Sequence, residues 1–346
     1  MKYLMVSTYP PKKCGIGTYA YQMVKFLRNG GNVVDVISLE GNGGDFTLNL
    51  KGGANLLKIL KYAIFYDKVI IQYHESFYYE EYNRKNLFRI LCTHLSFYLT
   101  FLLLRKKLEV IVHEFPRTHS HSTARFLETI KWRLCPKLVF HTQKEVDDFK
   151  QYYFDLTGKN YEIRAPNAYF YKFRDIPQSQ ARQELGIPSN AVVFLCIGFI
   201  QPHKGYDRAV REFQNINNRR MHLYVVGSIR IEWDAYTSYL QELKRMAANN
   251  PQIHIEEKFL SDEDFDTWIT ASDVILIPYR EIWSSGVLGR AKLFNKRVIA
   301  SNVGGLAEQL EDNDILFNTD EELRKIFEAF SKKLSASEVI KTPEIS

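Results

Sequence analysis

Apolar residues along the chain gather in short runs that are separated by longer amphipathic segments. Five such runs lie in the first half, and each has the length of a buried strand rather than of a helix. The segments between them have helical composition. Strands that alternate with helices are typical of a parallel sheet covered by helices. The first half is therefore predicted to hold such a sheet, with strands at residues 3–7, 33–38, 68–72, 109–112 and 138–141.

The pattern breaks between residues 161 and 190, where aromatic and polar residues surround Pro166, Pro177 and Pro188. We place a domain boundary in this stretch, since 346 residues exceed one ordinary core. The alternation then resumes and predicts a second parallel sheet, and an amphipathic helix follows Leu316. The expected class is α/β, with domains at residues 1–170 and 171–320 and a terminal helix and tail at 321–346. The strands of the second sheet are expected at residues 192–197, 222–226, 254–256, 274–278 and 297–300.

One apolar segment, residues 87–104, is interrupted by Arg89 and His94 and is followed by Arg105, Lys106 and Lys107. Its length is at the lower limit for a membrane-spanning helix. Three interpretations remain open: a span, a buried crossover helix, or a helix that dips into a membrane interface with its cations on phospholipid head groups. Aromatic residues favour such interfaces, and several lie nearby: Phe77, Tyr78, Tyr79 and Tyr82.

The charge of the chain is unevenly distributed. Residues 1–170 hold 24 lysines and arginines against 15 aspartates and glutamates, whereas residues 171–346 hold 22 against 25. A basic half indicates either a merely solvated face or an anionic partner, such as a membrane surface, a polyanionic substrate or nucleic acid. The cations are spread over many predicted helices without a known nucleic-acid motif, so no nucleic-acid partner is expected.

The four cysteines, Cys14, Cys92, Cys135 and Cys196, lack the spacing of a disulfide framework or a zinc site. A reducing cytoplasm is the expected compartment. The first residues contain no apolar core of signal-peptide length and instead match the first strand.

Glycine-containing turns follow several predicted strands, at the sheet edge where doubly wound folds bind ligands. The free amides of a helix start bind anions, and glycine lets the backbone approach a ligand closely. Lys204 lies in one of these turns, where its ammonium can reach a phosphate. The turns are at residues 15–17, 198–205, 284–287 and 304–305.

Several motifs occur in a characteristic order: STYPP and then GIG near the N-terminus, GFIQPHKGYD from Gly198, WITASDVILIPYR from Trp268, SSGV from Ser284 and VIASNVGGLAE from Val298. This order resembles the family 4 glycosyltransferases of the GT-B class over nearly the whole chain. The resemblance implies two Rossmann-like domains that face each other across a cleft. It also implies a nucleotide-sugar donor held mainly by the second domain, an acceptor held mainly by the first, and a C-terminal helix that crosses back to the first.

The resemblance also implies roles for individual residues. Lys204 would neutralise the donor diphosphate as the glycosidic bond breaks, which is catalysis by preorganised electrostatics. Gly15 and Gly17 would close over the same diphosphate from the first domain. A phosphate would also bind at a helix start, on the turn made by Ser285, Gly286 and Val287.

His113 would face the donor sugar and contact a hydroxyl or an oxyanion. Many family members have two glutamates eight positions apart, where this chain has Ile282 and Arg290. Glu281 lies one position early and is the candidate replacement beside the sugar. Phe199 stands where many members have a second phosphate-binding arginine, so Arg290, or Arg280, is the candidate additional cation.

The resulting expectation is a retaining, hexosyltransferase-like enzyme that uses a UDP- or GDP-sugar. Its mechanism would be front-face attack by an acceptor hydroxyl that is deprotonated by the departing phosphate. Because no D-x-D metal signature lies within the nucleotide motifs, neither a metal nor a further cofactor is expected. A lipid-linked or oligosaccharide acceptor would place the enzyme in cell-surface polysaccharide or glycolipid synthesis, cytoplasmic and peripheral on the inner face of an anionic cell membrane. The alternative is a catalytically weakened partner subunit that only binds nucleotide sugars.

Overall fold

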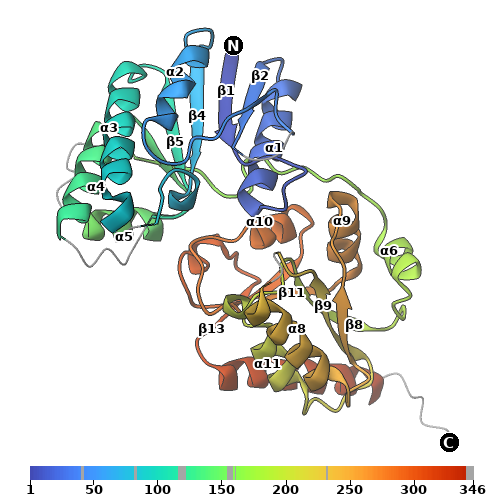
Figure 1. Cartoon of the computed structure of the whole chain (residues 1–346). Helices are drawn as coiled ribbons and strands as arrows, with labels where there is room; N and C mark the ends of the chain where they lie inside the picture. The colour runs from blue at the N-terminus through green and yellow to red at the C-terminus, as the bar shows by residue number, and fades with distance from the viewer. Residues whose placement is uncertain are drawn as a thin grey trace, which may run out of the picture. The chain divides into compact units, whose positions relative to one another are not determined.

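The computed structural model describes residues 1–39, 43–81, 84–115, 122–153, 159, 161–230 and 233–339. The chain forms two compact units, Met1–Phe170 and Tyr171–Ser346 (Figure 1). Each unit is a parallel sheet accompanied by helices. The predicted α/β class with two parallel sheets is confirmed.

The first unit is built on a sheet with the strand order β3-β2-β1-β4-β5-β6-β7, in which all neighbouring strands are parallel. The order reverses between β1 and β4, which is where doubly wound sheets bind ligands. The strands are β1 Lys2–Ser7, β2 Val33–Ser38, β3 Phe46–Thr47, β4 Lys68–Tyr73, β5 Leu108–Val112, β6 Leu138–Phe140 and β7 Tyr161–Ile163. The helices are α1 Gly15–Asn29, α2 Lys58–Ala63, α3 Leu87–Leu103, α4 Ser122–Leu134 and α5 Gln143–Tyr152, with short 3-10 turns η1 Asn55–Leu57, η2 Glu75–Phe77 and η3 Arg84–Asn86.

The second unit repeats this plan with the strand order β10-β9-β8-β11-β12-β13, again parallel throughout. Its reversal lies between β8 and β11. The strands are β8 Val192–Ile197, β9 Met221–Gly227, β10 Ile253–Glu257, β11 Val274–Ile277, β12 Arg297–Ser301 and β13 Ile315–Phe317. The helices are α6 Gln178–Leu185, α7 Tyr206–Phe213, α8 Asp234–Ala247, α9 Asp262–Ala271, α10 Gly286–Leu293 and α11 Asp320–Val339, with 3-10 turns η4 Pro202–Lys204 and η5 Ala307–Gln309.

Three short strands that the apolar pattern did not predict lie at sheet edges: β3, β7 and β13. Each has two or three residues, and most of their side chains are partly or fully exposed. These strands are shorter than the roughly four to eight residues from which an apolar pattern identifies a strand, and only β13 is apolar throughout. Strand β7 and helix α6 also give regular structure to part of the stretch where only a domain boundary was expected.

Helix α3 forms from the apolar segment and crosses between β4 and β5. One face is buried, with Phe97 and Phe101 fully inaccessible, whereas leucines on the opposite face are exposed. Among the described residues, no helix has the length and apolarity needed to cross a membrane. The buried-crossover prediction therefore holds for one face of α3 only. Tyr78 and Tyr79 are buried rather than interfacial, and Tyr82 lies outside the described residues.

The described residues of helix α11 pack within the second unit, whereas the resemblance implied a helix that crosses back to the first. Leu323 and Phe327 are fully buried within the hydrophobic core of the second unit. The Phe327 ring packs edge-on against Phe194 of β8 and Phe213 of α7, at centroid distances of 5.2 and 5.1 Å. This apolar face is satisfied inside its own domain, so α11 is part of the second unit.

Substitution of Phe327 tests this packing. We expect Phe327→Ala to lower the free energy of unfolding by about 3–5 kcal/mol, as for other buried aromatic residues. The exposed neighbour Glu328 gives a matched control, since Glu328→Ala should change stability by less than about 0.5 kcal/mol. Urea denaturation measures both. Equal, small effects of the two substitutions would show that α11 does not pack on the second unit.

Candidate functional site

The turn after β8 brings Lys204 to the carboxyl edge of the second sheet. It ends at Gly205, whose φ of +62° is strained for other residues. A Cβ atom at Gly205 would lie 2.1 Å from the Pro278 carbonyl oxygen, so only glycine permits this contact. The Arg280 amide also donates to the His203 carbonyl at 2.8 Å. The turn is therefore held tightly against the residues that follow β11.

Through this contact the Lys204 ammonium lies over the ring of Tyr279, 3.9 Å from the centroid. The Tyr279 side chain is itself 1% exposed. Among the described residues, no carboxylate forms an ion pair with Lys204. Loss of surrounding water lowers the pKa of Lys204 to about 7. The ammonium is thus a partly buried cation that an incoming anion would stabilise.

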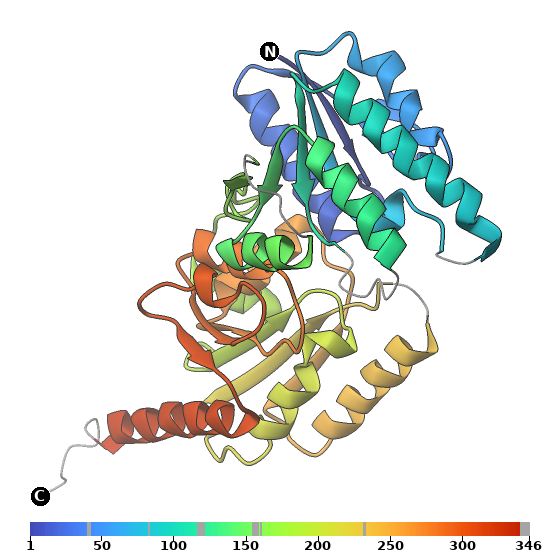
Figure 2. The same cartoon turned by 90° about the vertical axis from the view of Figure 1, so that its left-hand side faces the viewer.

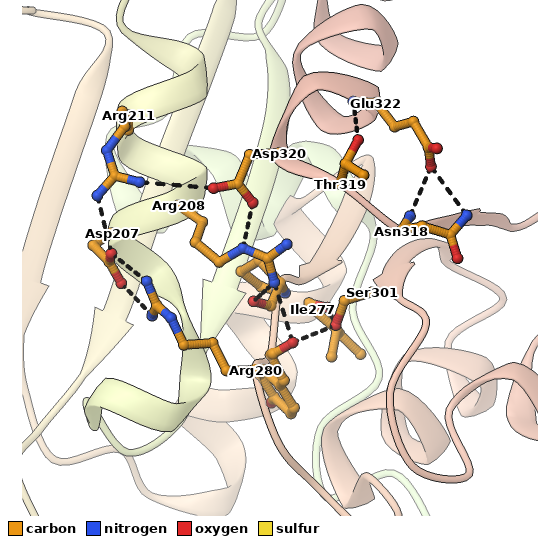
Figure 3. Close-up of polar contacts among 12 residues, drawn as sticks. Asp207, Arg208, Arg211, Ile277, Arg280, Ser301, Asn318, Thr319, Asp320 and Glu322 are labelled. Atoms are coloured by element: carbon orange, nitrogen blue, oxygen red, sulfur yellow. Dashed lines mark hydrogen bonds and ion pairs between the residues drawn. The ribbon is translucent and has the colours of Figure 1, made fainter.

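The segment Pro278 to Arg280 is fixed from behind by a polar network (Figure 3). Arg208 of α7 donates to the carbonyl oxygens of Pro278 at 3.0 Å and Tyr279 at 3.3 Å, and it pairs with Asp320 at 2.5 Å. The Ser301 hydroxyl also donates to the Tyr279 carbonyl at 2.6 Å. These contacts position the ring on which Lys204 rests.

Arg280, one of the candidate additional cations, faces a carboxylate. Its guanidinium forms two hydrogen bonds with Asp207, at 2.7 and 2.6 Å, and this pairing helps to lower the pKa of Asp207. The pair connects the start of α7 to the segment after β11. Arg280 therefore supports the turn. Its charge is already balanced by Asp207, so it does not add a second unpaired cation beside Lys204.

The start of α10 adds two backbone donors to the site. The Ser285 hydroxyl caps the helix by accepting from the Leu288 amide at 3.2 Å. The amides of Gly286 and Val287 have no hydrogen-bond acceptor among the described residues, as is usual for a first helical turn. A Cβ atom added at Gly198 would lie 3.7 Å from Val287 Cγ2, so this helix start adjoins the end of β8.

The second glycine turn of this region has a supporting role, which corrects the expectation that it binds phosphate. The Gly305 amide donates to the Trp283 carbonyl at 2.8 Å. Gly304, with φ of +55°, approaches the Ile282 carbonyl so closely that a Cβ atom would lie 1.8 Å from its oxygen. The turn props the loop that leads into α10, and its Gly305 amide is already occupied.

Arg290 is also committed within the second unit. Its guanidinium pairs with Asp266 at 2.7 Å and with Asp262 at 2.8 Å, both on α9. Asp266 is fully buried and also accepts from the backbone amides of Phe173 and Arg174. This geometry accounts for Arg290 as the link between α9 and α10, and we do not retain it as a donor-binding residue. Glu281 is exposed in the loop after β11, with no ion-pair partner among the described residues.

In the first unit, the predicted glycine loop lies at the start of α1. Gly15 is the first helical residue, and a Cβ atom there would meet nothing within 4 Å. At Gly17 a Cβ atom would lie 3.1 Å from the Thr8 carbonyl oxygen, so Gly17 lets α1 approach the end of β1 closely. Only Gly17 of the pair is thus explained by packing. The open surface at Gly15 leaves room for a ligand.

His113 follows β5 and is held by a residue that the sequence did not single out. Its Nε2 lies 2.6 Å from Gln72 Oε1, so Nε2 carries the proton and Nδ1 keeps a lone pair. Burial, together with nearby His141 and His74, lowers the pKa of His113 well below its usual value. A neutral imidazole with a free Nδ1 accepts a hydrogen bond from a hydroxyl group. It is not arranged to stabilise an oxyanion.

A polar hollow of about 420 Å³ lies beside the end of β4 in the first unit. His74 borders it and pairs through Nε2 with Glu114 at 2.6 Å. Carboxylates accept hydrogen bonds from hydroxyl groups, so the hollow suits a hydroxylated molecule. The other charged residues around it are Lys51, Glu75, Glu80 and Glu81.

Lys204 follows β8, and Ser285, Gly286 and Val287 follow β11, at the carboxyl edge of the second sheet. Sequence reasoning missed Tyr279 as the support for Lys204 and Gln72 as the partner of His113. Tyr279 lies inside the motif WITASDVILIPYR, so the sequence could have identified it as a residue near the site. Gln72 shows no signal, because a buried glutamine within a strand resembles any other strand residue.

Comparison with known proteins relates part of the second unit to a family. Residues 191–335 match the family model described as Glycosyl transferases group 1. A curated relative, D-inositol 3-phosphate glycosyltransferase 2 from Catenulispora acidiphila, is 26% identical over 188 residues, which are 51% of this chain and 42% of the relative. The match thus spans less than half of that relative's length.

Solved structures resemble the whole chain. Sucrose-phosphate synthase from Thermosynechococcus elongatus superposes with a TM-score of 0.69 and 14% identity, over 95% of this chain and 90% of its own. HepE from Anabaena, solved in complex with UDP, gives a TM-score of 0.69 and 16% identity, over 96% and 91%. Residues 191–335 are therefore a domain of the glycosyl transferases group 1 family, and the chain as a whole has the fold of GT-B glycosyltransferases.

Proposed function

We propose that the protein is a retaining glycosyltransferase. It moves a hexose-like sugar from a UDP- or GDP-sugar to a hydroxyl of a lipid-linked or oligosaccharide acceptor. The observation that carries the proposal is the Lys204 ammonium, which lies on the Tyr279 ring without a carboxylate partner among the described residues. The open amides of Gly286 and Val287 start the helix that adjoins the same sheet edge. Cation and amides together form a site for a diphosphate.

In this proposal the second unit stabilises the leaving group. As the bond between the sugar C1 and the phosphate oxygen breaks, negative charge grows on the diphosphate. Lys204 and the α10 amides meet that charge without rearrangement. The acceptor oxygen bonds to C1 on the same face, and its proton passes to the departing phosphate oxygen. No step requires a metal or a carboxylate base.

The first unit would supply contacts to the sugar and the acceptor. His113 Nδ1 would accept a hydrogen bond from a donor-sugar hydroxyl, and the open surface at Gly15 would admit the diphosphate. Glu281, in the exposed loop before α10, remains the candidate carboxylate beside the sugar. The carboxylates around the polar hollow near His74 would accept hydrogen bonds from hydroxyl groups of the acceptor substrate. The basic first half fits a lipid-linked acceptor. Such an acceptor would place the enzyme peripherally on the inner face of the cell membrane, in surface polysaccharide or glycolipid synthesis.

A second candidate function is a partner subunit that binds nucleotide sugar without transferring it. Arg290 motivates this alternative, because many family members have a glutamate at its position. In this chain Arg290 forms ion pairs with Asp262 and Asp266. In that case diphosphate binding would remain while turnover would be absent.

Turnover distinguishes the two functions. We expect transfer from one member of a panel of UDP- and GDP-sugars to lipid-linked or oligosaccharide acceptors, and proton NMR of the product should show the anomeric configuration of the donor. Nucleotide binding is measured alongside by calorimetry. Binding without any transfer would favour the partner subunit, inversion would refute the retaining mechanism, and neither binding nor transfer would refute both functions.

Two lysines of the second unit provide a matched test of the site. Burial lowers the pKa of both, to about 7 for Lys204 and about 8 for Lys296. The Lys296 ammonium, however, donates to the carbonyl oxygens of Thr270 and Ser272, at 2.8 and 2.7 Å. We expect Lys204→Met to weaken UDP binding at least thirtyfold, because it removes the diphosphate cation. Lys296→Met should leave binding within twofold.

The two substitutions should have opposite effects on the free energy of unfolding. At pH 7 Lys204→Met should stabilise the fold by about 1–3 kcal/mol, because each unit of lowered pKa corresponds to about 1.4 kcal/mol and residual solvent reduces the effect. Lys296→Met leaves two carbonyls without a donor and should destabilise by about 1–3 kcal/mol. Calorimetric titration and urea denaturation measure the two quantities. Unchanged UDP affinity in Lys204→Met would remove Lys204 from the mechanism.

A further inference from the structure

Helix α3 carries an apolar stripe that the fold leaves uncovered. Phe88 is 77% exposed, Leu95 57% and Leu103 66%. The exposed residues recur every three or four positions, which places them on one face of the helix. The opposite face packs into the first unit. The complete stripe is Leu87, Phe88, Leu91, Leu95, Leu99, Leu102 and Leu103.

Neighbouring elements extend this stripe. Helix α3 contacts α4 and η1, and α3 (teal) and α4 (green) lie side by side in a helical layer of the first unit (Figure 2). Phe126 of α4 is 64% exposed, and Ile64 and Phe65, which follow α2, are 70% and 69% exposed. We call the stripe and these three residues the α3 surface. A stripe of exposed apolar residues along a whole helix, with further exposed apolar residues on neighbouring elements, indicates an interaction site rather than ordinary exposure.

The charges next to helix α3 in the sequence are of one sign. Between Glu81 and Glu109 the chain contains no aspartate or glutamate. Lys85 precedes the helix, and Arg105 and Lys106 follow it. All three are exposed and have no ion-pair partner among the described residues. The two ends of the helix are therefore positively charged, and an occupant of the surface must be apolar in its middle and anionic at its edges.

Two other cations of the region are already used. Arg89 pairs with Glu80 at 2.9 Å. The Lys107 ammonium donates to the carbonyl oxygens of Ala63 and Tyr66, so it joins the end of α2 to the turn after α3. Lys107 thus has a structural role. A test of charge at the end of α3 should change Arg105 and Lys106 and leave Lys107 in place.

We propose that the α3 surface docks the protein on an anionic phospholipid bilayer. Helix α3, about 25 Å long at 1.5 Å per residue, lies flat in the interface with its leucines in the acyl region. Lys85, Arg105 and Lys106 reach the phosphate groups. A second copy of the chain is disfavoured as occupant, because a symmetric contact would bring like charges together. The inference rests on the proposed function for its biological sense, since docking would present a lipid-linked acceptor to the enzyme.

Vesicle sedimentation of the full chain tests the proposal without nucleotide or acceptor. We expect binding to vesicles of phosphatidylcholine with 30% phosphatidylglycerol and at least tenfold weaker binding to pure phosphatidylcholine. The variant Leu95→Gln, Leu99→Gln, Leu102→Gln should lower the partition coefficient at least tenfold. Arg105→Ser with Lys106→Ser should lower it at least threefold and reduce its salt dependence. Trp233→Gln removes an apolar residue of the second unit that is 58% exposed and should change nothing.

UDP binding, measured on every variant without vesicles, reports on the donor site and on folding. Retained UDP affinity with lost vesicle binding confirms docking. Failure of the wild type to bind anionic vesicles, or equal binding by the leucine and charge variants, overturns the proposal whether or not transfer is found. Concentration-dependent dimers that disappear in the leucine variant, without vesicle binding, would instead assign the surface to self-association. If the leucine variant fails to fold, the charge variant decides.

Discussion

The close approach of Gly205 to the Pro278 carbonyl is the constraint on which the candidate site depends. It is possible only without a side chain at residue 205, and it brings the turn after β8 against the residues that follow β11. These two strands flank the point where the strand order reverses, so the contact forms where a doubly wound sheet leaves a crevice. Arg208 and Ser301 then hold the Tyr279 carbonyl from behind, and Lys204 comes to rest on the Tyr279 ring.

The same region shows a division of labour among its cations. Arg208, Arg280 and Arg290 pair with carboxylates of the second unit and stabilise its helices and turns. Lys204 keeps its ammonium over an aromatic ring, and the loss of surrounding water disfavours the charged form. The Tyr279 ring favours the ammonium through a cation–π contact, but it supplies no full negative charge to offset the lost water. The position of Lys204 is explained if an anionic ligand supplies the missing negative charge.

The sequence predicted most of the fold because buried parallel strands are continuous apolar runs, as in 192–197 and 274–277. It missed β3, β7 and β13, which are edge strands of two or three residues and too short for such a pattern. Motif order singled out Lys204 and the segment in which α10 begins at Gly286. It could not show that Arg290 is tied to Asp266 or that the Gly305 amide is occupied, because these contacts join segments whose packing only the fold reveals. The sequence also did not show that the terminal helix buries Phe327 in the core of the second unit.

The central claim is that Lys204 is a diphosphate-binding cation kept ready by its surroundings. Its most direct test is carbon-13 NMR titration of the lysine ε-carbons, with the Lys204 signal assigned from the Lys204→Arg variant. In the free protein the pKa should be about 7. Saturating UDP should raise that pKa by at least one unit, because the diphosphate favours the ammonium. A pKa near the ordinary lysine value of 10.5 that does not respond to UDP would contradict the account.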